Sequence, residues 1–584
     1  MEALPVGGEE YIPTLDEDPA LGLSHRAKME ILFAVMLGLF LGALDQTIVG
    51  PALPTIVTQL SGNDYYVWAI TIYLLTNTIS VPFWGKLSDI YGRKPIFMIG
   101  IVIFLVGSAL SGLSQNMGML ILFRGIQGIG AGSLFPVALA VIGDLFTPQE
   151  RGKYQGLFGA VFGIAFVAGP LIGGWLTENL SWHWIFYVNI PIGIIALIVI
   201  QRLLPTVKTA SATRNFDLIG GAIFTVAMVF LLVGLTNKQF GEWAEPTVGG
   251  FIIIGLVGTL LFILAESRAT EPIVPLDLWK GRTYSATMVA VFFAAFAFFG
   301  AIVFLPRWFQ VVEGFSPTNS GLAALPLMVG LIGSSIVSGY LVSRTGRYKW
   351  LLVGAIATMG VATLLMTQLT KDTPLPVVWL WMFIAGLGVG PTFSVFTIVI
   401  QNAVPFRQLG VATSNLTFFR QIGGTIALAL VGTIFGTTFK DQLLPQLSAA
   451  GVPAPVISGF GQASAGGGFD LNSLTGVGDL GAAILAAVPA QFQELIKPAI
   501  PAMVDGIHGA FSLAVAQTFY LGVAGAVIAV LAAVAIKEIP LRATNAAPVA
   551  TVALGTAAAP HVAGAPSAPA HVNAPIREVK PSLD

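Results

Sequence analysis

The sequence contains no cysteine among its 584 residues, and charged residues make up only 10% of the chain. The absence of cysteine excludes disulfide bonds, thiolate metal ligands and a cysteine nucleophile. Soluble globular proteins carry roughly 25% charged residues, because these cover the surface that meets water. A chain of this size with so few charges therefore exposes much of its surface to lipid. The net charge of −1 gives no reason to expect nucleic-acid binding.

Long apolar runs are abundant instead. A run needs about 20 residues to cross a bilayer as a helix. Fourteen such runs lie at residues 31–53, 67–83, 95–113, 120–142, 157–176, 185–204, 218–235, 248–265, 286–309, 322–342, 351–369, 377–400, 411–435 and 511–536. The 67 glycines suit helices that approach one another closely in a bilayer. The sequence thus predicts an all-α membrane protein with fourteen transmembrane helices.

The distribution of basic residues predicts the orientation. With a cytoplasmic N-terminus, the cytoplasmic segments hold 21 of the 28 Lys and Arg residues and the opposite side holds four, while three lie inside spans. The positive-inside rule then places both termini in the cytoplasm. We expect a multi-pass protein of the plasma membrane.

The chain also repeats itself. Three sets of residues in the first part of the chain recur with the same spacing in the second part. Gly85, Gly92 and Arg93 recur as Gly339, Gly346 and Arg347. Gly128, Gly130 and Gly132 recur as Gly386, Gly388 and Gly390, and Gly152 recurs as Gly410. The second and third sets are both offset by 258 residues. Two related six-helix halves with two inserted helices explain this pattern, and such halves form transporters with the substrate path between them. The alternative is chance in a glycine-rich chain.

The repeat divides the chain into regions. These are a disordered N-terminus (1–28), a six-helix half (29–205), two inserted helices with linkers (206–283), a second six-helix half (284–540) and a disordered Ala/Pro-rich tail (541–584). The second half includes a long extracytoplasmic connection, 436–510. Apolar residues there recur every three or four positions from Leu480 to Ile507, which predicts an amphipathic helix at the membrane surface, broken by prolines.

Several motifs resemble those of the major facilitator superfamily and, within it, the fourteen-span drug:proton antiporters. They are the loop Gly85-x3-Asp89-x2-Gly92-Arg93-Lys94, the helix-4 pattern Arg124-x2-Gln127-Gly128-x-Gly130, the first-helix segment from Leu44 to Pro54, the start of helix 6 from Trp182 to Pro191, and the helix-13 pattern Gly410-x9-Arg420-Gln421-x-Gly423-Gly424. The resemblance covers about residues 30–540. It implies the major facilitator fold.

The fifth span of this sequence contains a pattern that resembles the antiporter motif of the family's helix 5. It consists of Gly156, Gly169, Pro170, Gly173 and Gly174. One glycine of that motif is replaced by Ala165, which is still small enough for close helix approach. The span at 377–400 has no acidic residue, whereas some family members carry one there. This difference argues against recognition of dications.

Four charged residues lie inside predicted spans: Asp45, Arg124, Arg307 and Arg420. Each costs about 2.5–3.5 kcal/mol at the centre of a span on insertion scales, so such residues are functional candidates. We expect Asp45, the only acid among them, to carry the coupled proton, with Arg124 holding it ionised. The alternatives are structural: hydrogen bonds between helices for Asp45 and Arg124, helix packing for Arg420, and snorkelling for Arg307.

Two further groups of residues have predicted roles. By the family resemblance, a latch that joins the halves in the outward-open state comprises Gly85, Asp89, Gly92, Arg93 and Arg347. The alternative for Asp89 and Arg93 is a solvated pair worth under about 1 kcal/mol. Polar or aromatic residues expected to line a substrate cavity are Tyr73, Asn77, Gln127, Gln310, Asn415, Phe418 and Arg420.

These features predict a secondary transporter that exports amphipathic or hydrophobic molecules, drugs or envelope lipids, in exchange for protons. A proton-coupled nutrient importer and a non-transporting receptor are the alternatives. No phosphate loop, nucleophile with a base, or metal-binding cluster is evident, so we do not expect an enzyme. We expect no cofactor, since the proton gradient is the energy source. The expected partners are the substrate, protons and membrane lipids, and we expect a monomer.

Overall fold

The computed structural model describes residues 23–60, 68–205, 216–238, 241–457, 480–487, 493–494 and 496–541. The predicted disordered ends lie outside this part of the chain, except for residues 23–28 and Leu541. Helices of the first half are α1 (His25–Gln59), α2 (Trp68–Tyr91), α3 (Arg93–Gly112), α4 (Met117–Leu145), α5 (Pro148–Asn179), α6 (Trp184–Tyr187) and α7 (Asn189–Leu203). The inserted helices are α8 (Leu218–Asn237) and α9 (Phe251–Glu266), the latter preceded by a π-helical turn, Pro246–Gly250.

The second half contains α10 (Arg282–Val311), α11 (Pro317–Ala323), α12 (Leu325–Thr345), α13 (Lys349–Met366), α14 (Leu375–Ala403), α15 (Leu409–Ala449), α17 (Leu480–Ala487) and α19 (Ile500–Ala535). Short 3-10 helices cover Leu276–Lys280, Phe406–Gln408 and Lys497–Ala499. Among the described residues, thirteen helical segments are long and apolar enough to cross a membrane, and α2, a helix of 24 residues between the first two of them, completes the predicted fourteen. The predicted all-α membrane protein with fourteen transmembrane helices is therefore confirmed.

Local sequence explains where helices begin and end. The Ser24 side chain accepts a hydrogen bond from the Ala27 amide, so α1 begins at His25, inside the segment predicted to be disordered. Thr147 and Glu150 form a reciprocal capping box at the start of α5. Gly346 ends α12 in the left-handed conformation, with φ of 69°.

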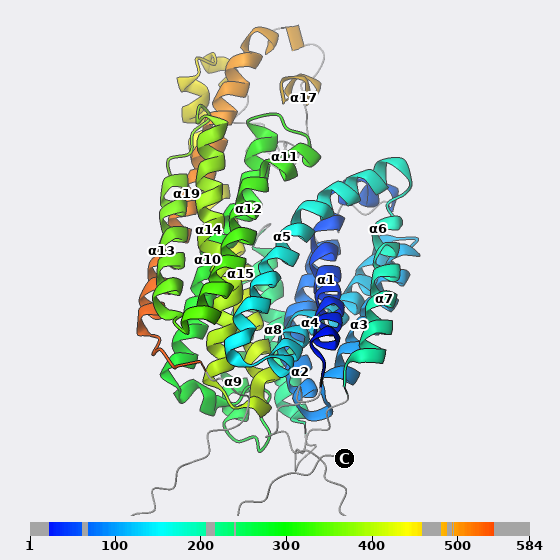
Figure 1. Ribbon diagram of the computed structural model, residues 1–584. Helices are drawn as coiled ribbons and strands as arrows, with labels where there is room; N and C mark the ends of the chain where they lie inside the picture. The colour runs from blue at the N-terminus through cyan, green and yellow to red at the C-terminus, as the bar shows by residue number, and fades with distance from the viewer. Residues whose placement is uncertain are drawn as a thin grey trace, which may run out of the picture. The chain divides into compact units, whose positions relative to one another are not determined.

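The helices form two groups that follow the internal repeat (Figure 1). The halves meet through α2 against α15 and through α5 against α12. These two contacts are equivalent in the repeat, because α12 corresponds to α2 and α15 to α5. The inserted helices α8 and α9 pack on each other, and α8 also contacts α2 and α15. The insertion therefore contacts both halves.

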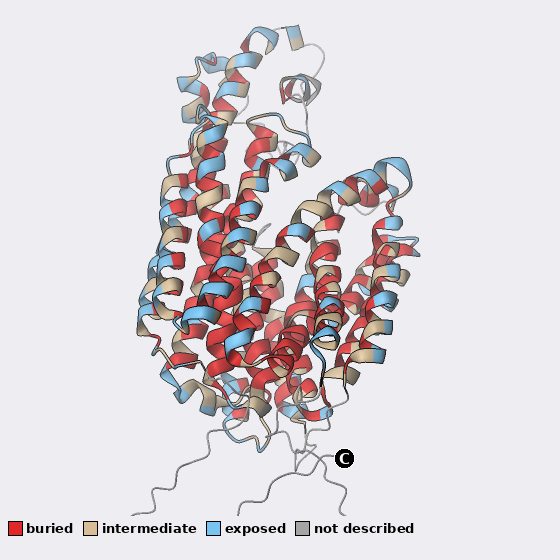
Figure 2. Cartoon of the chain, in the orientation of Figure 1, coloured by how far each residue is buried: buried red, intermediate tan, exposed pale blue. Residues whose placement is uncertain are grey.

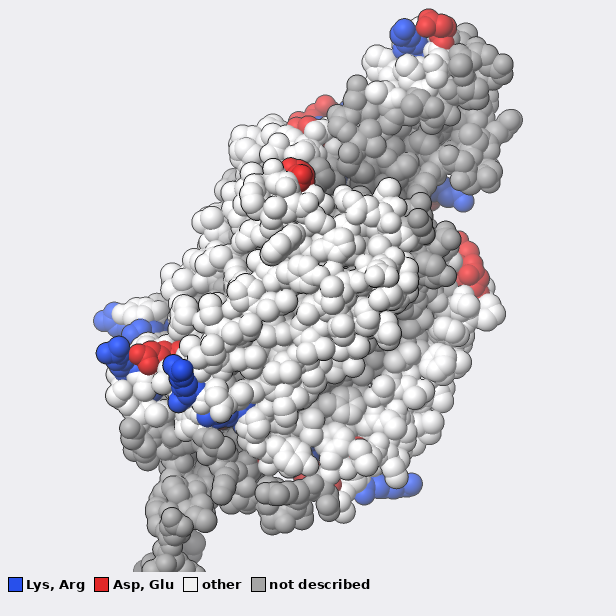
Figure 3. Space-filling model, turned by 90° about the vertical axis from the view of Figure 1, so that its right-hand side faces the viewer, with Lys and Arg blue, Asp and Glu red and all other residues white. Residues whose placement is uncertain are grey.

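Burial separates the interior of the helix bundle from its outer surface (Figure 2). Large apolar side chains are nevertheless exposed along outward faces, for example Ile253 and Leu260 of α9 at 62% and 58%. One face carries a broad region without charged residues between charged groups above and below (Figure 3). An uncharged, apolar surface of this extent is suited to contact with lipid tails rather than water.

The start of α1 and the end of α19 lie at the same end of the helix bundle, together with the junctions between α2 and α3 and between α12 and α13 (Figure 1). We call this the terminal side and the opposite end the distal side.

On the distal side the second half extends well beyond a bilayer. The 41 residues of α15 correspond to roughly 60 Å of helix, about twice the thickness of a hydrocarbon core. Residues 436–449 and 500–510, predicted to belong to the connection, therefore continue α15 and α19. We call this part the distal projection (436–457, 480–487, 493–494 and 496–510).

The predicted surface helix is wrong for the described part of this segment. Leu480 and Ile484 of α17 are buried in the same apolar cluster as Leu447, Met503 and Ile507. Their apolar faces are thus covered by protein. Residues 488–492 and 495 of the predicted helix lie outside the described residues.

Candidate functional site

A buried ion pair connects the first and fourth helices. Asp45 of α1 is fully buried, and its Oδ2 lies 2.6 Å from Nη1 of Arg124 on α4. Arg124 is 2% exposed, and its guanidinium lies 4.0 Å above the centre of the Tyr73 ring. The sequence predicted that these two charges are neighbours, and the structure brings them into direct contact.

Amide side chains complete the contacts of the carboxylate. Gln127 donates to Asp45 Oδ1 at 2.8 Å and accepts from Arg124 Nη1 at 2.8 Å. Asn189 at the start of α7 donates to the same Oδ1 at 3.0 Å and to Ser108 Oγ of α3 at 3.0 Å. A buried ion pair is tolerated only when such additional hydrogen bonds satisfy its remaining polar atoms. These residues, together with Tyr73 beneath the guanidinium, form the Asp45 network: Asp45, Tyr73, Ser108, Arg124, Gln127 and Asn189.

The network retains unused hydrogen-bonding capacity. Among the described residues, Tyr73 Oη, Arg124 Nε and Asn189 Oδ1 are buried without a hydrogen-bond partner. Buried polar groups are normally satisfied, so unpaired groups around one ion pair indicate a site that can rearrange. Protonation of Asp45 would be such a rearrangement, since it turns an acceptor of three donors into a group that can itself donate.

Sequence reasoning found only part of the network. Tyr73 and Gln127 were assigned to a substrate cavity, whereas the structure places both against Arg124. Asn189 appeared only within the helix-6 motif, although an amide beside an apolar run was a usable signal. Ser108 had no signal, because serine is common in transmembrane helices.

A second charged group joins the halves at the terminal side. Asp89 of α2 accepts the backbone N–H of Gly410 at 3.0 Å and of Val411 at 2.8 Å. These are the second and third residues of α15, whose own N-cap residue, Gln408, makes no side-chain capping bond. Asp89 thus caps a helix of the opposite half, where a negative charge is favoured by the helix dipole.

Arg93 holds this carboxylate in place. It pairs with Asp89, and its Nε donates to Asp144 of α4 at 3.1 Å, while its Nη1 donates to Ser88 at 2.8 Å. Gly85 lies so close to Ser414 and the Gly410 carbonyl that any side chain would overlap with them. Gly92 precedes α3 with φ of 91°, which favours glycine.

Arg347 does not join this group. It is exposed, and two hydrogen bonds link its backbone to the Thr345 hydroxyl: the N–H donates to Thr345 Oγ1 at 3.2 Å, and the carbonyl accepts from the same Oγ1 at 3.4 Å. In the repeat, Ser343 occupies the position of Asp89. The helix that would need capping there, α5, is already capped by Thr147 and Glu150. The charged contact is therefore one-sided, and the inclusion of Arg347 in the latch is corrected.

An uncharged contact between the halves lies nearby. Gln155 of α5 donates to Gln401 Oε1 of α14 at 2.7 Å, and Gln401 Nε2 donates to the Leu139 carbonyl of α4 at 2.9 Å. Gln401 also lies against Gly143, its counterpart at the 258-residue offset. A residue that faces its own counterpart lies at the pseudo-twofold axis between the halves. Sequence patterns did not indicate this contact.

The helix-5 motif places small residues where α5 meets two other helices. Gly169 and Gly173 face Thr47 and Ile48 of α1, too closely for a side chain, and Thr47 Oγ1 donates to the Ala165 carbonyl at 3.0 Å.

On another stretch of α5, the Gly156 carbonyl accepts from Ser335 Oγ of α12 at 3.0 Å. Nearer the distal side, Gly174 and Pro170 face Thr318 and Gly321 of α11. α5 therefore connects the helix that carries Asp45 to the opposite half.

The other predicted cavity residues are dispersed. Asn77 is buried on α2, one turn after Tyr73. Gln310 donates to Ser320 and Asn415 donates to Tyr284, each at 2.9 Å, within the second half. Phe418 packs against Phe224 of α8, with ring centres 5.4 Å apart.

Arg420 lies near the contact of the halves. Its Nη2 donates to the Thr392 carbonyl at 3.1 Å, and its guanidinium lies 4.5 Å above the Phe393 ring. Phe393 in turn packs against Phe162 of α5, with ring centres 5.2 Å apart.

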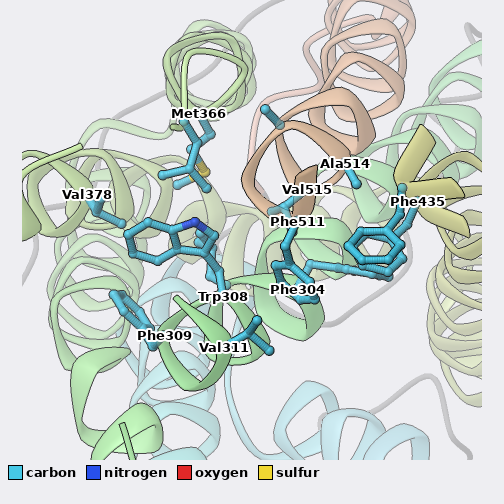
Figure 4. Packing of buried hydrophobic residues seen from close by; sticks show 14 of the residues in the cluster. Phe304, Trp308, Phe309, Val311, Met366, Val378, Phe435, Phe511, Ala514 and Val515 are labelled. Carbon is cyan, nitrogen blue, oxygen red and sulfur yellow. The ribbon is translucent and has the colours of Figure 1, made fainter. Parts of the chain in front are cut away.

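The second half has no counterpart of the Asp45 network among its described residues. At the repeat offset Arg124 corresponds to Met382, which is 1% exposed in an apolar cluster with Trp308. Figure 4 shows Trp308 surrounded by apolar side chains of this cluster. The two halves share a fold but differ in charge, so a titratable carboxylate inside the bundle is a property of the first half.

Comparisons with known proteins agree with this architecture. Residues 35–428 match the family model described as Major Facilitator Superfamily. The multidrug transporter protein MdtP of Bacillus subtilis is 38% identical over 489 residues, covering 82% of this chain and 89% of that protein. Multidrug resistance protein 3 of the same organism is 35% identical over 415 residues, covering 71% and 80%.

Two solved structures share the fold at low sequence identity. The proton:xylose symporter XylE superposes with a TM-score of 0.56 at 12% identity, covering 90% of this chain and 99% of that one. The human organic anion transporter MFSD10 gives a TM-score of 0.52 at 16% identity, covering 70% and 94%.

Proposed function

Because this chain belongs to the major facilitator superfamily of membrane transporters, we propose that it exports amphipathic or hydrophobic small molecules, drugs or envelope lipids, in exchange for protons. The similarity to multidrug transporters supports the direction and the substrate class. Lys and Arg residues are in excess on the terminal side, which supports a cytoplasmic location of that side in the plasma membrane.

The observation that carries proton coupling is the Asp45 network. Asp45 is fully buried, supplies the counter-charge of Arg124 and accepts hydrogen bonds from two amides. When Asp45 takes up a proton, Arg124 loses its counter-charge inside the bundle. Since an unpaired buried charge is strongly unfavourable, protonation favours a different arrangement of α1 and α4.

A route from this site to the opposite half runs through α5. Movement of α1 acts on α5 where Gly169 and Gly173 touch Thr47 and Ile48, and α5 contacts α12 through Gly156 and Ser335. At the terminal side Asp89 and Gln401 hold the halves together. We assign these contacts as the latch that must open before the substrate path reaches the cytoplasm.

One acid is energetically sufficient for a neutral substrate. Moving one charge through 100 mV releases about 2.3 kcal/mol. Since tenfold accumulation costs about 1.4 kcal/mol, a single proton at that potential sustains a gradient of roughly fiftyfold. No cofactor is needed for this cycle.

The test is transport by purified protein in liposomes under an imposed pH gradient, with a fluorescent lipophilic dye as substrate and a pH-sensitive dye as proton reporter. Antiport predicts that substrate and protons move in opposite directions, and that collapsing the gradient stops uphill transport. Movement in the same direction would instead indicate an importer. Uphill movement that persists without the gradient would contradict proton coupling.

A further inference from the structure

We infer that Arg420 binds the anionic group of an amphipathic substrate, a carboxylate, sulfonate or phosphate, so that the transporter favours anions over cations. This inference rests on the proposed transport function and names the charge of the molecule that is moved.

The depth of Arg420 places it inside the membrane layer. It lies eleven residues after Leu409, the first residue of α15, which corresponds to roughly 16 Å along the helix. Its carbonyl partner, Thr392, lies eleven residues before the end of α14, so both helices give the same depth. In a hydrocarbon core of about 30 Å this position is near the middle.

No carboxylate compensates this charge. Among the described residues, the ion pairs include Asp45 with Arg124, but none involves Arg420. A guanidinium has five N–H donors, and one hydrogen bond to a carbonyl uses only one of them. A lone cation at this depth is unfavourable, so it is a functional candidate.

The remaining donors are accessible. Arg420 is partly exposed, and none of its nitrogens is among the buried atoms that lack a partner, whereas Nε of Arg124 is. The free N–H groups therefore reach accessible surface inside the membrane layer, where an anion can approach them. A guanidinium binds such groups through two parallel hydrogen bonds.

This surface is bordered by the contact between the halves. The Phe393 ring beneath the guanidinium packs against Phe162 of the first half and lies 6.0 Å from the Phe298 ring of α10. In transporters built from two such halves the substrate path lies between them. Phenylalanine rings beside a cation suit a molecule with an apolar body and one anionic group.

The charges inside the predicted spans disfavour a cationic substrate. A cation would require a carboxylate, and Asp45 in the opposite half is already neutralised by Arg124. The four charged residues of the predicted spans, Asp45, Arg124, Arg307 and Arg420, sum to a charge of +2. Electrostatic complementarity therefore selects anions.

Equilibrium binding tests the inference without any proton gradient. The probes share a dansyl fluorophore on an undecyl chain and differ only in the end group, a carboxylate in one and an amine in the other. Wild-type protein in a mild non-ionic detergent should bind the carboxylate probe more tightly, with displacement by unlabelled dodecanoate. Arg420→Gln should weaken the carboxylate probe about tenfold or more and leave the amine probe unchanged or tighter.

Two variants serve as controls. Arg420→Lys keeps the charge and should retain most of the affinity for the carboxylate probe. Arg268→Gln removes an exposed arginine on the terminal side and should bind as wild type does. Thermal unfolding in detergent checks that each variant is folded.

Several results would overturn the inference. They are a wild-type preference for the amine probe, binding of neither probe, an equal loss of both probes in Arg420→Gln, or failure of Arg420→Lys in a folded protein. Because binding is measured without a gradient, the anion site and proton coupling can fail independently. If the carboxylate probe binds as expected but transport does not depend on the pH gradient, only the proposed proton coupling is refuted.

Discussion

At Asp45, donors from α4 and α7 converge on a carboxylate of α1. Arg124 is the only one of them that carries a charge, so its bond is an ion pair, while Gln127 and Asn189 donate from neutral amides. Loss of the negative charge on Asp45 would therefore cost Arg124 the most, because its own charge would be left unpaired inside the bundle. The protonation of Asp45 is therefore linked mainly to the position of Arg124, and the amides orient the carboxylate.

Asp45→Asn should abolish uphill export while the protein still folds and binds neutral substrate. Asparagine retains the size of aspartate but cannot titrate, so no proton is exchanged during the cycle. The measurement is substrate accumulation in proteoliposomes under an imposed pH gradient, where we expect loss of the gradient-driven component.

The matched control is Asp277→Asn, which removes an exposed carboxylate paired with Lys280 and should transport like wild type. Uphill transport by Asp45→Asn at the normal rate would remove Asp45 from the mechanism. Glu313, outside the spans, would then be the next acid to test, since burial raises the pKa of its carboxyl above the usual range.

The functional residues that could be predicted from the sequence are those whose insertion into a membrane span is energetically costly. A charge inside an apolar run is rare, so Asp45 and Arg124 were evident, and their pairing followed from depth. Asn189, Ser108 and Gln401 are uncharged residues that transmembrane helices tolerate readily. Their partners come from distant helices, and no spacing in the chain encodes that meeting.

At the level of helices, the contact at the terminal side is a helix cap: Asp89 of the first half caps the start of α15 in the second half. The first turn of α15 has free N–H groups, and Asp89 satisfies two of them across the interface. Opening this interface exposes those groups and separates a charge from the helix dipole. In the proposed latch, the strength of this contact sets how readily the terminal side opens.

Asp89→Asn should slow turnover several-fold without preventing folding or substrate binding. The neutral amide can accept only one of the two N–H bonds, and it loses the interaction with the dipole and with Arg93, worth about 1–2 kcal/mol. Initial transport rates in proteoliposomes measure this.

Glu150→Gln is the control, because it weakens the cap of α5 within its own half. A wild-type rate for Asp89→Asn, or an equal effect of the two substitutions, would contradict the latch.

The absence of cysteine allows a direct test of the second contact. Gln155→Cys combined with Gln401→Cys, joined by a short bis-methanethiosulfonate linker, should stop transport, because the amide pair between the halves must separate in each cycle. Reduction should restore the rate. Each single variant, treated with the same reagent, should keep transporting, and full activity of the cross-linked double variant would show that this contact stays closed.

Helix identity was predictable from the sequence, but helix length was not. Every apolar run corresponds to a helix, because the membrane requires backbone hydrogen bonds to be satisfied within each span. The end of an apolar run marks the membrane boundary, which need not be the end of the helix. The predicted span ends at Phe435, yet α15 continues to Ala449, and Leu443 and Leu447 of this extension lie in one apolar cluster with residues of α19 and α17.

For the molecule as a whole, the orientation in the membrane stays a prediction, and the cysteine-free chain permits a clean test. Asp372→Cys, exposed between α13 and α14, should react with an impermeant maleimide in intact cells. Lys280→Cys, exposed between α9 and α10, should react only after the membrane is permeabilised. The reverse pattern would place the terminal side outside the cell.

The distal projection is the other whole-molecule feature with an expected effect. Its apolar cluster continues from Phe435 near the bilayer to Met503 beyond it, so it forms one body with the second half. Deletion of residues 445–505 should change the relative transport rates across a panel of lipophilic dyes. Lys371→Gln, which breaks only the ion pair with Asp505, should leave these rates unchanged. An unchanged profile after the deletion would make the projection a connector.

The two-half architecture followed from the repeat, whereas the difference in charge between the halves did not. Gly85 and Gly92 recur as Gly339 and Gly346, because close helix approach requires the first of each pair and a positive φ favours glycine at the second. Asp89 and Arg124 occur once, and their repeat positions hold Ser343 and Met382. A repeat reveals shared packing, while chemistry that only one half performs must be found residue by residue.

The length of α15 also has a mechanical consequence. Its first turn is held at the terminal side by Asp89, and its last residue, Ala449, lies roughly 57 Å further along the same helix. A rigid rod that tilts about one end sweeps its widest arc at the other. If the halves rock by about 10°, the tip travels about 10 Å, several times further than groups beside the pivot. The distal projection is thus a lever arm that converts a small tilt inside the membrane into a large excursion above it.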